Sequence, residues 1–222
     1  MEPMIDFQLI YNSLPYLLRG TIVSLEIAFL GCLIGVSLGT VLGLLQSGTN
    51  KLTQWFVAIY ATIFRGTPML IQITFVYSVL PEFGIVLPAF WSAVIAIGLN
   101  SAAYLSQIIR SGISSVGKGQ IEAAHVMGFS KLQTIRYIVL PQAFAVIVPA
   151  LGNEFITLVK DSSLASTIGV AELYKEATRI KGISYDVVSV YTAVSLIYLV
   201  ITTTLSIGIN KLEKRMNRHV RN

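Results

Sequence analysis

Five long stretches without internal charge, apart from one arginine, dominate the sequence and limit the folds that it can adopt. Each approaches or exceeds the roughly 20 residues that a helix needs to cross a bilayer. A transmembrane barrel would show short segments of alternating hydrophobicity instead. We therefore predict an all-α polytopic membrane protein with five transmembrane helices. The stretches are Ile27 to Asn50, Leu52 to Leu80 interrupted by Arg65, Phe83 to Ile109, Tyr137 to Asn153, and Val187 to Asn210.

Composition supports this assignment. Hydrophobic residues form 54% of the chain and charged residues 12%, about half of the usual charged share. The first stretch is too long for a signal peptide and follows a polar lead without a basic start, so we expect it to stay in the mature chain. The single cysteine, Cys32, and the two histidines, His125 and His219, exclude disulfides and a multi-histidine metal centre.

The distribution of basic residues predicts how the chain crosses the membrane, because loops rich in lysine and arginine stay in the cytoplasm. Ten of the 16 basic residues lie in segments that five spans place on one side: Lys51, Arg110, Lys118, Lys131, Arg136, Lys211, Lys214, Arg215, Arg218 and Arg221. The opposite side holds Arg19, Lys160, Lys175, Arg179 and Lys181. The pattern predicts an N-terminus outside and a C-terminus inside.

The loop from Lys160 to Asp186 fits this topology least well, because four of its residues are basic. Its uncharged part, Ser162 to Ala171, is too short to cross the membrane. We therefore predict that the loop is external, with a partly re-entrant path as an alternative. No internal repeat or linker divides the chain, so we expect a single transmembrane domain over residues 1–222.

Two features suggest how the helices pack. Gly31, Gly35, Gly39 and Gly43 recur every four residues and lie on one helix face, where they allow another helix to approach closely. Arg65, Gly66 and Pro68 interrupt the second apolar stretch. Proline removes a backbone donor, so this span is expected to be kinked or broken. The interruption is either a hinge or an arginine at the cytoplasmic boundary.

The segment 110–136 is predicted to form a compact cytoplasmic loop. Ile121 to Met127 favours a short helix that ends at Gly128, and Ser130 can cap a second helix. The preceding Gly112 to Gly119 is close to a phosphate-binding loop, but Gly119 replaces the required Ser or Thr and a helix comes before it. We expect no nucleotide site on this chain.

This loop carries the pattern EAA, three residues, G, nine residues, I-x-LP, from Glu122 to Pro141. The pattern resembles the coupling loop of bacterial ABC importer membrane subunits. Similarity extends to RGTP at Arg65 to Pro68, LNSAAY at Leu99 to Tyr104, LPQA at Leu140 to Ala143, and the stretch Leu151 to Leu173. Together these motifs resemble the polar-amino-acid permease family, which serves histidine, arginine, glutamine and cystine uptake.

The resemblance implies a type I importer core in the bacterial inner or plasma membrane, paired with a second copy or a paralogue. It implies ATP-binding subunits that engage Glu122, Ala123, Ala124 and Gly128, and an extracytoplasmic solute-binding protein that delivers the amino acid. ATP and magnesium would then bind to the partner ATPase. The expected role is that of a transport subunit, not an enzyme. The net charge of +5 is explained by anionic lipid and implies no nucleic acid.

Costly polar groups within the membrane suggest the solute path. Asn100 lies in the third span, Glu154 late in the fourth, and Lys160 and Asp161 follow shortly after. Glu154 is interpreted as a counter-charge for a cationic amino acid such as arginine, lysine or histidine, with glutamine and cystine as open alternatives. A structural pairing of Glu154, for example with Lys160, is a second interpretation.

An ion-coupled secondary carrier or a channel would also explain five helices with buried polar groups. Such a protein needs no docking site for an ATPase, and carriers often show inverted repeats, which are not visible here. A membrane enzyme would need converging acid, base or metal-ligating groups, and neither histidine is suitably placed.

Overall fold

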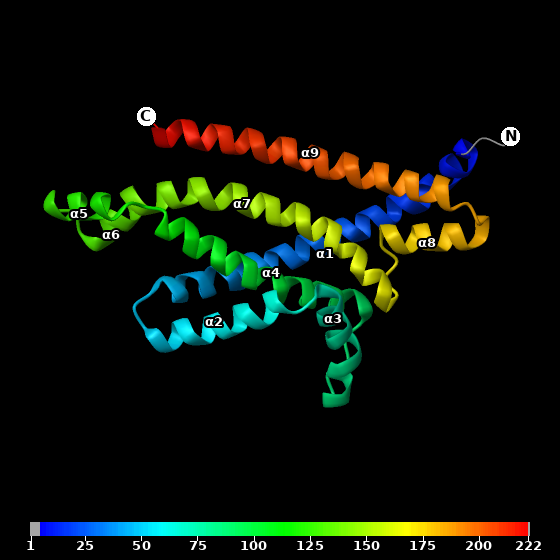
Figure 1. The fold of residues 1–222 in the computed structure, drawn as a ribbon, viewed down its shortest axis with the longest axis horizontal. Coiled ribbons are helices and arrows are strands. Elements are labelled where there is room, and N and C mark those ends of the chain that lie inside the picture. The colour runs from blue at the N-terminus through cyan, green and yellow to red at the C-terminus, as the bar shows by residue number, and fades with distance from the viewer. Residues whose placement is uncertain (1–4, 222) are drawn as a thin grey trace. The chain divides into compact units, whose positions relative to one another are not determined.

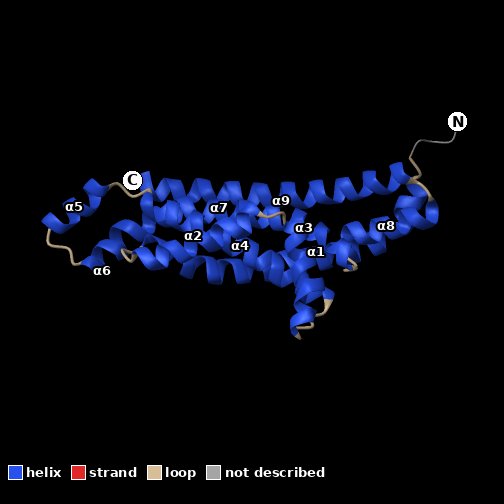
Figure 2. Ribbon diagram, turned by 60° about the horizontal axis from the view of Figure 1, so that its bottom comes forward, coloured by secondary structure: helices blue, strands red, loops and turns tan. Residues whose placement is uncertain are grey.

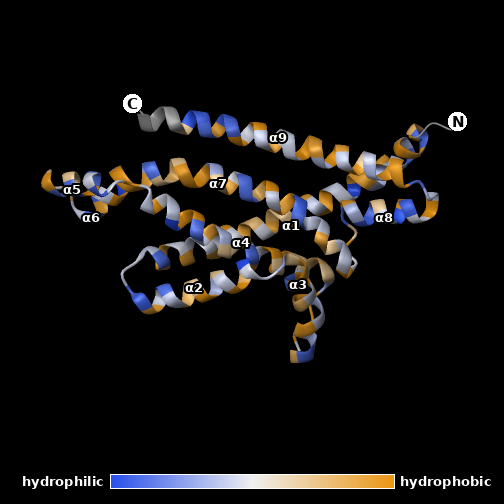
Figure 3. Ribbon diagram, viewed as in Figure 1, coloured by the Kyte–Doolittle hydropathy of each residue, from blue (hydrophilic) through white to orange (hydrophobic). Residues whose placement is uncertain are grey.

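The structure is a computed structural model that describes residues 5–221, with side chains described for residues 5–216. Within this range the chain is helical and contains no strand (Figures 1 and 2). Four helices are long and apolar enough to cross a membrane, and the number rises to five if the bent pair Lys51–Gly66 and Met69–Phe83 forms one broken span. Hydrophobic residues recur along the spans, whereas the last coloured turns of α9 (Val187–Arg221) are hydrophilic (Figure 3). The predicted all-α membrane fold is confirmed, with four to five candidate spans.

The first span begins earlier than the sequence suggested. Helix α1 covers Phe7–Ser47, so it includes most of the lead that was expected to be polar. Asp6 stabilises its start, because its carboxylate accepts a hydrogen bond from the Leu9 amide at 2.9 Å. Between Phe7 and Ser24 the only charge is Arg19, and Leu17 in this segment is buried. Leu17, Leu9 and Ile10 of this segment pack against α8 (Leu173–Ser184) and α9 (Val187–Arg221).

The second span is broken near the predicted place. Helix α2 covers Lys51–Gly66 and α3 covers Met69–Thr74; a π-helical turn, η1 (Phe75–Val79), and a 3-10 turn, η2 (Leu80–Phe83), follow. Pro68 has an extended backbone, with φ −62° and ψ 137°. Since proline also restricts the residue before it, the helix cannot continue through Thr67. A hinge role for Arg65, Gly66 and Pro68 stays a prediction.

The remaining spans are α4 (Ala89–Ser114), α7 (Leu140–Asp161) and α9 (Val187–Arg221). Helix α7 runs eight residues beyond the predicted end at Asn153, so Lys160 lies in its last turn and not in a loop. A 3-10 helix, η4 (Ser162–Ile168), and α8 (Leu173–Ser184) lead on to α9. Two short helices, α5 (Lys118–Val126) and α6 (Lys131–Thr134), and the π-helical turn η3 (Ile135–Val139) connect α4 to α7.

The chain forms two compact units. The first comprises 1–33, 67–98 and 155–204, and the second comprises 34–66, 99–154 and 205–222. The long helices α1, α4, α7 and α9 each contribute to both, so the units are not successive domains. The predicted single domain over 1–222 stays a prediction.

In the first unit, α8 packs against the beginnings of α1 and α9 (Figure 1). The buried residues of this core are Leu17, Leu173, Ala177, Val190, Ala193 and Val194. Gly20 allows the backbones to meet, because a Cβ there would lie 2.9 Å from the Leu173 backbone. This core holds the 160–186 segment against two of the spans.

In the second unit, α1 lies against α4 along the glycine stripe. A Cβ on Gly35 would lie 2.6 Å from the Ser101 hydroxyl, and one on Gly39 would lie 2.7 Å from the Leu105 Cβ. Gly43 meets Ile109 in the same way, and within the first unit Gly31 meets Ile97. The partners recur every four residues on α4. The stripe therefore creates the close helix packing that small residues permit.

Candidate coupling loop and solute path

The loop between α4 and α7 has a well-defined turn at its centre. Helix α5 ends at Val126, and the turn that follows it contains Gly128, which has φ +83°. The Gly128 amide donates to the His125 carbonyl and the Phe129 amide donates to the Ala124 carbonyl, each at 3.0 Å. These two bonds form a Schellman motif, and glycine adopts its left-handed backbone without strain. The turn therefore needs glycine at position 128.

The second short helix starts with a complete capping box. The Gln133 amide donates to the Ser130 hydroxyl at 3.3 Å, and the Ser130 amide donates to the Gln133 side chain at 2.8 Å. This arrangement satisfies two backbone groups that a four-residue helix would otherwise leave open. The sequence prediction of two short helices joined by a glycine agrees with these bounds.

A glutamine joins this loop to the span that follows. The side-chain amide of Gln142 in α7 donates to the Gln120 side chain in α5 at 2.5 Å and to the Ile138 carbonyl at 2.9 Å. The Gln142 amide thus bridges the first short helix and the π-helical turn that leads into α7. This contact connects α5 directly to α7.

The loop presents an apolar surface to its surroundings. Val126 is 88% exposed, Met127 67% and Leu132 75%. Of the four predicted coupling residues, Ala124 is buried, whereas Glu122, Ala123 and Gly128 are exposed. Gly117 occupies the N-cap of α5, so Glu122 does not cap its own helix. Its carboxylate forms no ion pair with any side chain among residues 5–216.

Asn100, predicted on the solute path, holds two helices of the second unit together. Its amide donates to the Phe64 carbonyl at 2.9 Å, in the last turn of α2. Tyr60 donates in the other direction, to the Leu99 carbonyl at 2.6 Å. Arg65 lies over the Tyr104 ring, with its guanidinium carbon 5.2 Å from the centroid. The RGTP and LNSAAY segments thus meet in space.

The other three predicted path residues all lie on α7. Glu154 is half-buried and belongs to the second unit. Lys160 and Asp161 belong to the first unit, where Lys160 is exposed and lines a pocket. Contact of any of these residues with a solute stays a prediction.

Sequence reasoning missed a buried acid. Glu172 is 0% exposed and caps α8, since its carboxylate accepts hydrogen bonds from the Tyr174 amide at 2.9 Å and the Lys175 amide at 2.7 Å. The Ser24 hydroxyl of α1 donates to the same carboxylate. In the sequence Glu172 counts as one more loop acid. The only hint is its place between the apolar Val170-Ala171 and Leu173.

Burial raises the pKa of the Glu172 carboxyl to about 7, because removal from water penalises the charged form. The amides of Tyr174 and Lys175 and the Ser24 hydroxyl oppose this shift, since they favour the carboxylate. The Tyr198 hydroxyl lies beside the same group and is buried without a hydrogen-bond partner of normal geometry among the described residues. The cluster therefore joins α1, α8 and α9 around one titratable group.

The chain is similar to a protein family, to several individual proteins and to solved structures. A family model described as "Binding-protein-dependent transport system inner membrane component" matches residues 35–218. The arginine transport system permease protein ArtQ of Bacillus subtilis is 36% identical over 213 residues, covering 96% of this chain and 97% of that protein. The L-cystine permease TcyB of the same organism is 37% identical, covering 97% and 93%.

The glutamine permease GlnP of Escherichia coli is 34% identical, covering 95% of this chain and 97% of that protein. A crystal structure of an amino acid ABC transporter with histidines matches with a TM-score of 0.90 and 37% identity, covering 95% of this chain and 99% of that one. A methionine transporter structure, MetNI, matches with a TM-score of 0.70 at 22% identity, which shows a shared fold.

Proposed function

Because this chain belongs to the family of inner membrane components of binding-protein-dependent transport systems and is a permease of amino-acid ABC transporters, we propose how it works and what it carries. It forms the membrane path for a polar amino acid that an extracytoplasmic solute-binding protein delivers. Separate ATP-binding subunits dock on the 110–136 loop in the cytoplasm. A second copy or a paralogue completes the path.

The exposed surface of the 110–136 loop carries this proposal. Val126, Met127 and Leu132 are apolar side chains that a lone loop would leave in water, and such patches mark protein interaction sites. The exposed Glu122 offers a charge to a partner cation. Nucleotide-driven movement of the partner would reach α7 through the contact of Gln120 with Gln142.

The substrate is a polar amino acid, and a cationic one such as arginine, lysine or histidine is slightly favoured. A half-buried carboxylate on a spanning helix, Glu154, supports this preference as a counter-charge. Glutamine and cystine are alternatives, since relatives at similar identity are named for each of them. Replacing Glu154→Gln should reduce uptake of a cationic amino acid while leaving assembly intact. Unchanged uptake would contradict the counter-charge role.

Reconstitution tests the proposed function. The chain is placed in liposomes with its ATP-binding partner and solute-binding protein, and uptake of labelled amino acids is measured. We expect accumulation only when both partners and ATP are present. Flux without the ATPase would overturn the proposal in favour of the alternative, an ion-coupled carrier or channel.

The orientation is tested independently. In a Cys32→Ala background, a thiol introduced by Lys131→Cys should react with a membrane-impermeant reagent only from the cytoplasmic side. Reaction from outside intact cells would overturn both the docking role of the loop and the predicted N-outside, C-inside topology.

A further inference from the structure

Helix α8 has one side turned to its own chain and one side turned away from it. Leu173 and Ala177 belong to the core that α8 forms with α1 and α9. Lys175, Arg179 and Ile183 follow one another at intervals of four residues, so they share the other side of the helix. All three are exposed. This side of α8 therefore offers two cations and one large apolar side chain to its surroundings.

The helix ends in a strained aromatic residue. Tyr185 has φ +58°, and its amide donates to the Lys181 carbonyl at 2.9 Å. Glycine adopts this left-handed conformation freely, whereas a residue with a large side chain adopts it at a cost in free energy. Contacts within the chain offset little of that cost, because the Tyr185 side chain is 86% exposed. Strained residues of this kind are typical of functional sites.

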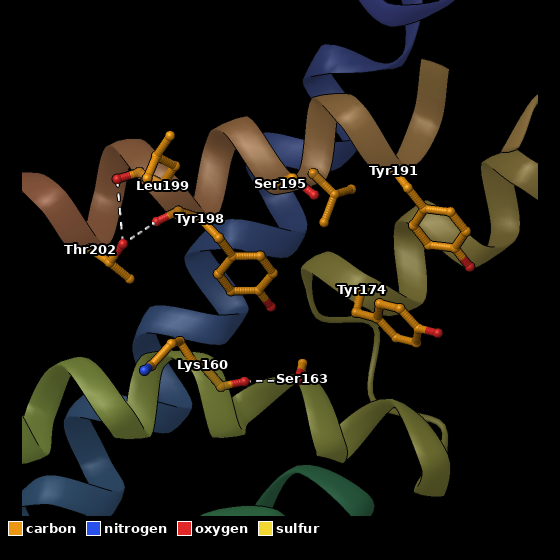
Figure 4. Close-up of a pocket in the computed structure, with 9 residues that line it drawn as sticks. Lys160, Ser163, Tyr174, Tyr191, Ser195, Tyr198, Leu199 and Thr202 are labelled. Carbon is orange, nitrogen blue, oxygen red and sulfur yellow. Dashed lines mark hydrogen bonds between the residues drawn. The ribbon is translucent and has the colours of Figure 1, made fainter. Parts of the chain in front are cut away.

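The first unit holds α8 in a fixed position. Tyr174 at its start lies beside Tyr191 of α9, with the ring centroids 6.0 Å apart, and both line the pocket shown in Figure 4. Near its end the Lys181 ammonium lies 5.9 Å from the centroid of the Tyr191 ring. The buried Glu172 caps its first turn. A surface that is already ordered loses little conformational entropy when a partner binds.

The place of α8 in the chain limits which partners can reach it. One span, α7, separates α8 from the 110–136 loop, so the two lie on opposite sides of the membrane. Lipid is a poor partner, because a helix that lies in the membrane surface inserts its apolar face into the bilayer. The apolar face of α8 is covered by α1 and α9. The exposed side suits a protein whose surface is acidic around an apolar spot.

We propose that Lys175, Arg179, Ile183 and Tyr185 form a docking face for an acidic surface of the extracytoplasmic solute-binding protein. The proposal rests on the proposed function, which supplies the partner and the side of the membrane. Ile183 and Tyr185 make the apolar contact, and the two cations steer the approach. Among the described residues, the only ion pair of Arg179 is a 3.8 Å contact with Glu176, so its guanidinium is available.

Replacing the strained tyrosine separates docking from stability. The complete transporter is reconstituted with the solute-binding protein that supports its uptake, and the affinity is taken from direct binding and from the concentration that gives half-maximal uptake. Tyr185→Gly should weaken the affinity about tenfold, as loss of a central aromatic contact does. Its melting temperature should be equal or higher, because glycine relieves the strain at φ +58°. Unchanged affinity would overturn the proposal.

A conservative variant shows whether the ring makes the contact. Tyr185→Phe keeps the ring and the backbone strain, so its affinity should stay within about twofold of the natural chain. A tenfold loss in this variant as well would overturn the apolar contact. A lower melting temperature in Tyr185→Gly, together with unchanged affinity, would show that Tyr185 has a structural role in its own chain.

The charges are tested through the rate of association. Lys175→Gln combined with Arg179→Gln should slow association about fivefold at low salt, and the difference should vanish at high salt, where exposed charges are screened. Lys211→Gln combined with Lys214→Gln removes the same charge from exposed residues on the predicted cytoplasmic side and is the control. Equal effects of the two pairs would overturn the steering role.

Two further measurements separate the other occupants. The effect of Tyr185→Gly should be the same in phosphatidylcholine bilayers with and without phosphatidylglycerol; an effect confined to the anionic bilayer would show a lipid anchor and overturn the proposal. Separation of the two permease copies in this variant would show a contact with the second copy and also overturn it. Natural uptake combined with variants of unchanged affinity refutes only the docking face. Absence of ATP-driven uptake by the natural chain refutes the proposed function.

Discussion

The Ser24 hydroxyl donates a hydrogen bond of 3.3 Å to the carboxylate of Glu172, which follows it by 148 residues. The Leu173 amide in turn donates to the Ser24 hydroxyl at 3.2 Å. These bonds, together with the close approach at Gly20, hold the start of α8 on α1. A buried acid therefore stabilises the segment between the last two spans, and its protonation state should affect how firmly that segment is held.

Glu172→Gln should make the packing of α8 less dependent on pH. In the folded chain the pKa of Glu172 is about 7, against 4.5 for the free group. As pH rises from 4.5 to 7, the unfolded chain loses its proton before the folded chain does, so the free energy of unfolding falls, by up to about 3 kcal/mol. Below and above this window Glu172 adds no further pH dependence to the free energy of unfolding.

The measurement is hydrogen exchange of the α8 amides, corrected for intrinsic rates, between pH 4.5 and 8. The Gln variant should gain protection relative to the natural chain as pH rises. Glu176→Gln, on the same helix, removes only a weak 3.8 Å ion pair with Arg179 and is the matched control. A difference between Glu172→Gln and the natural chain that does not vary with pH would contradict the prediction.

Gly128→Val should uncouple the transporter. A β-branched residue is strained at φ +83°, by about 1 to 2 kcal/mol or more, although no atom lies within 4 Å to clash with it. The turn between α5 and α6 would change while the spans still insert. ATP-driven uptake and the amount of protein in the membrane are measured together. Gly119→Ala, in α5 and also in open space, is the control, and full uptake by the Val variant would count against the prediction.

Gly39→Ala should lower thermal stability. The added Cβ would lie 2.7 Å from the Leu105 Cβ and 3.0 Å from the Ala102 carbonyl oxygen, and neither can move without shifting a helix backbone. Overpacking of this kind costs roughly 1 to 3 kcal/mol. In Gly208→Ala in α9 the added Cβ meets no atom within 4 Å, so this variant should have the melting temperature of the natural chain. Equal melting temperatures for both variants would show that α1 and α4 are less tightly packed.

Asn100→Ala should weaken the attachment of α2 to α4. The variant leaves the Phe64 carbonyl without the Asn100 amide, which costs about 1 to 2 kcal/mol for a buried group. Tyr60→Phe removes the bond to the Leu99 carbonyl between the same helices and should lower the melting temperature comparably. If Asn100 also contacts solute, only its variant should alter substrate preference. An unchanged melting temperature in the Asn100 variant would contradict the structural role.

Much of the fold follows from local pattern. Uninterrupted apolar stretches must become helices in a membrane, because hydrocarbon cannot satisfy free backbone groups. Pro68 breaks its span whatever the span packs against, because the proline ring acts only on neighbouring residues of the same chain. Gly128 and Ser130 likewise act through adjacent backbone atoms, which is why the two short helices could be predicted from their residues.

Other features depended on partners distant in the chain. Leu17 of α1 packs against α8 and α9, and no property of residues 7–26 alone reveals those partners. From the sequence alone Asn100 is a candidate solute contact, whereas in the structure its amide donates to the Phe64 carbonyl. The same holds for Lys160, whose pocket is formed by residues up to 42 positions later in the chain.

The sequence by itself determined that the chain spans a membrane with apolar helices, that the second apolar stretch is broken, and that two short helices follow the third. Helix formation, interruption and capping depend on residues a few positions apart, so these features can be predicted from short stretches of the sequence. Only the tertiary structure decided that Glu172 is buried beside Ser24 and that Lys160 lines a pocket with residues of α8 and α9, because burial depends on which distant segments fold over a residue.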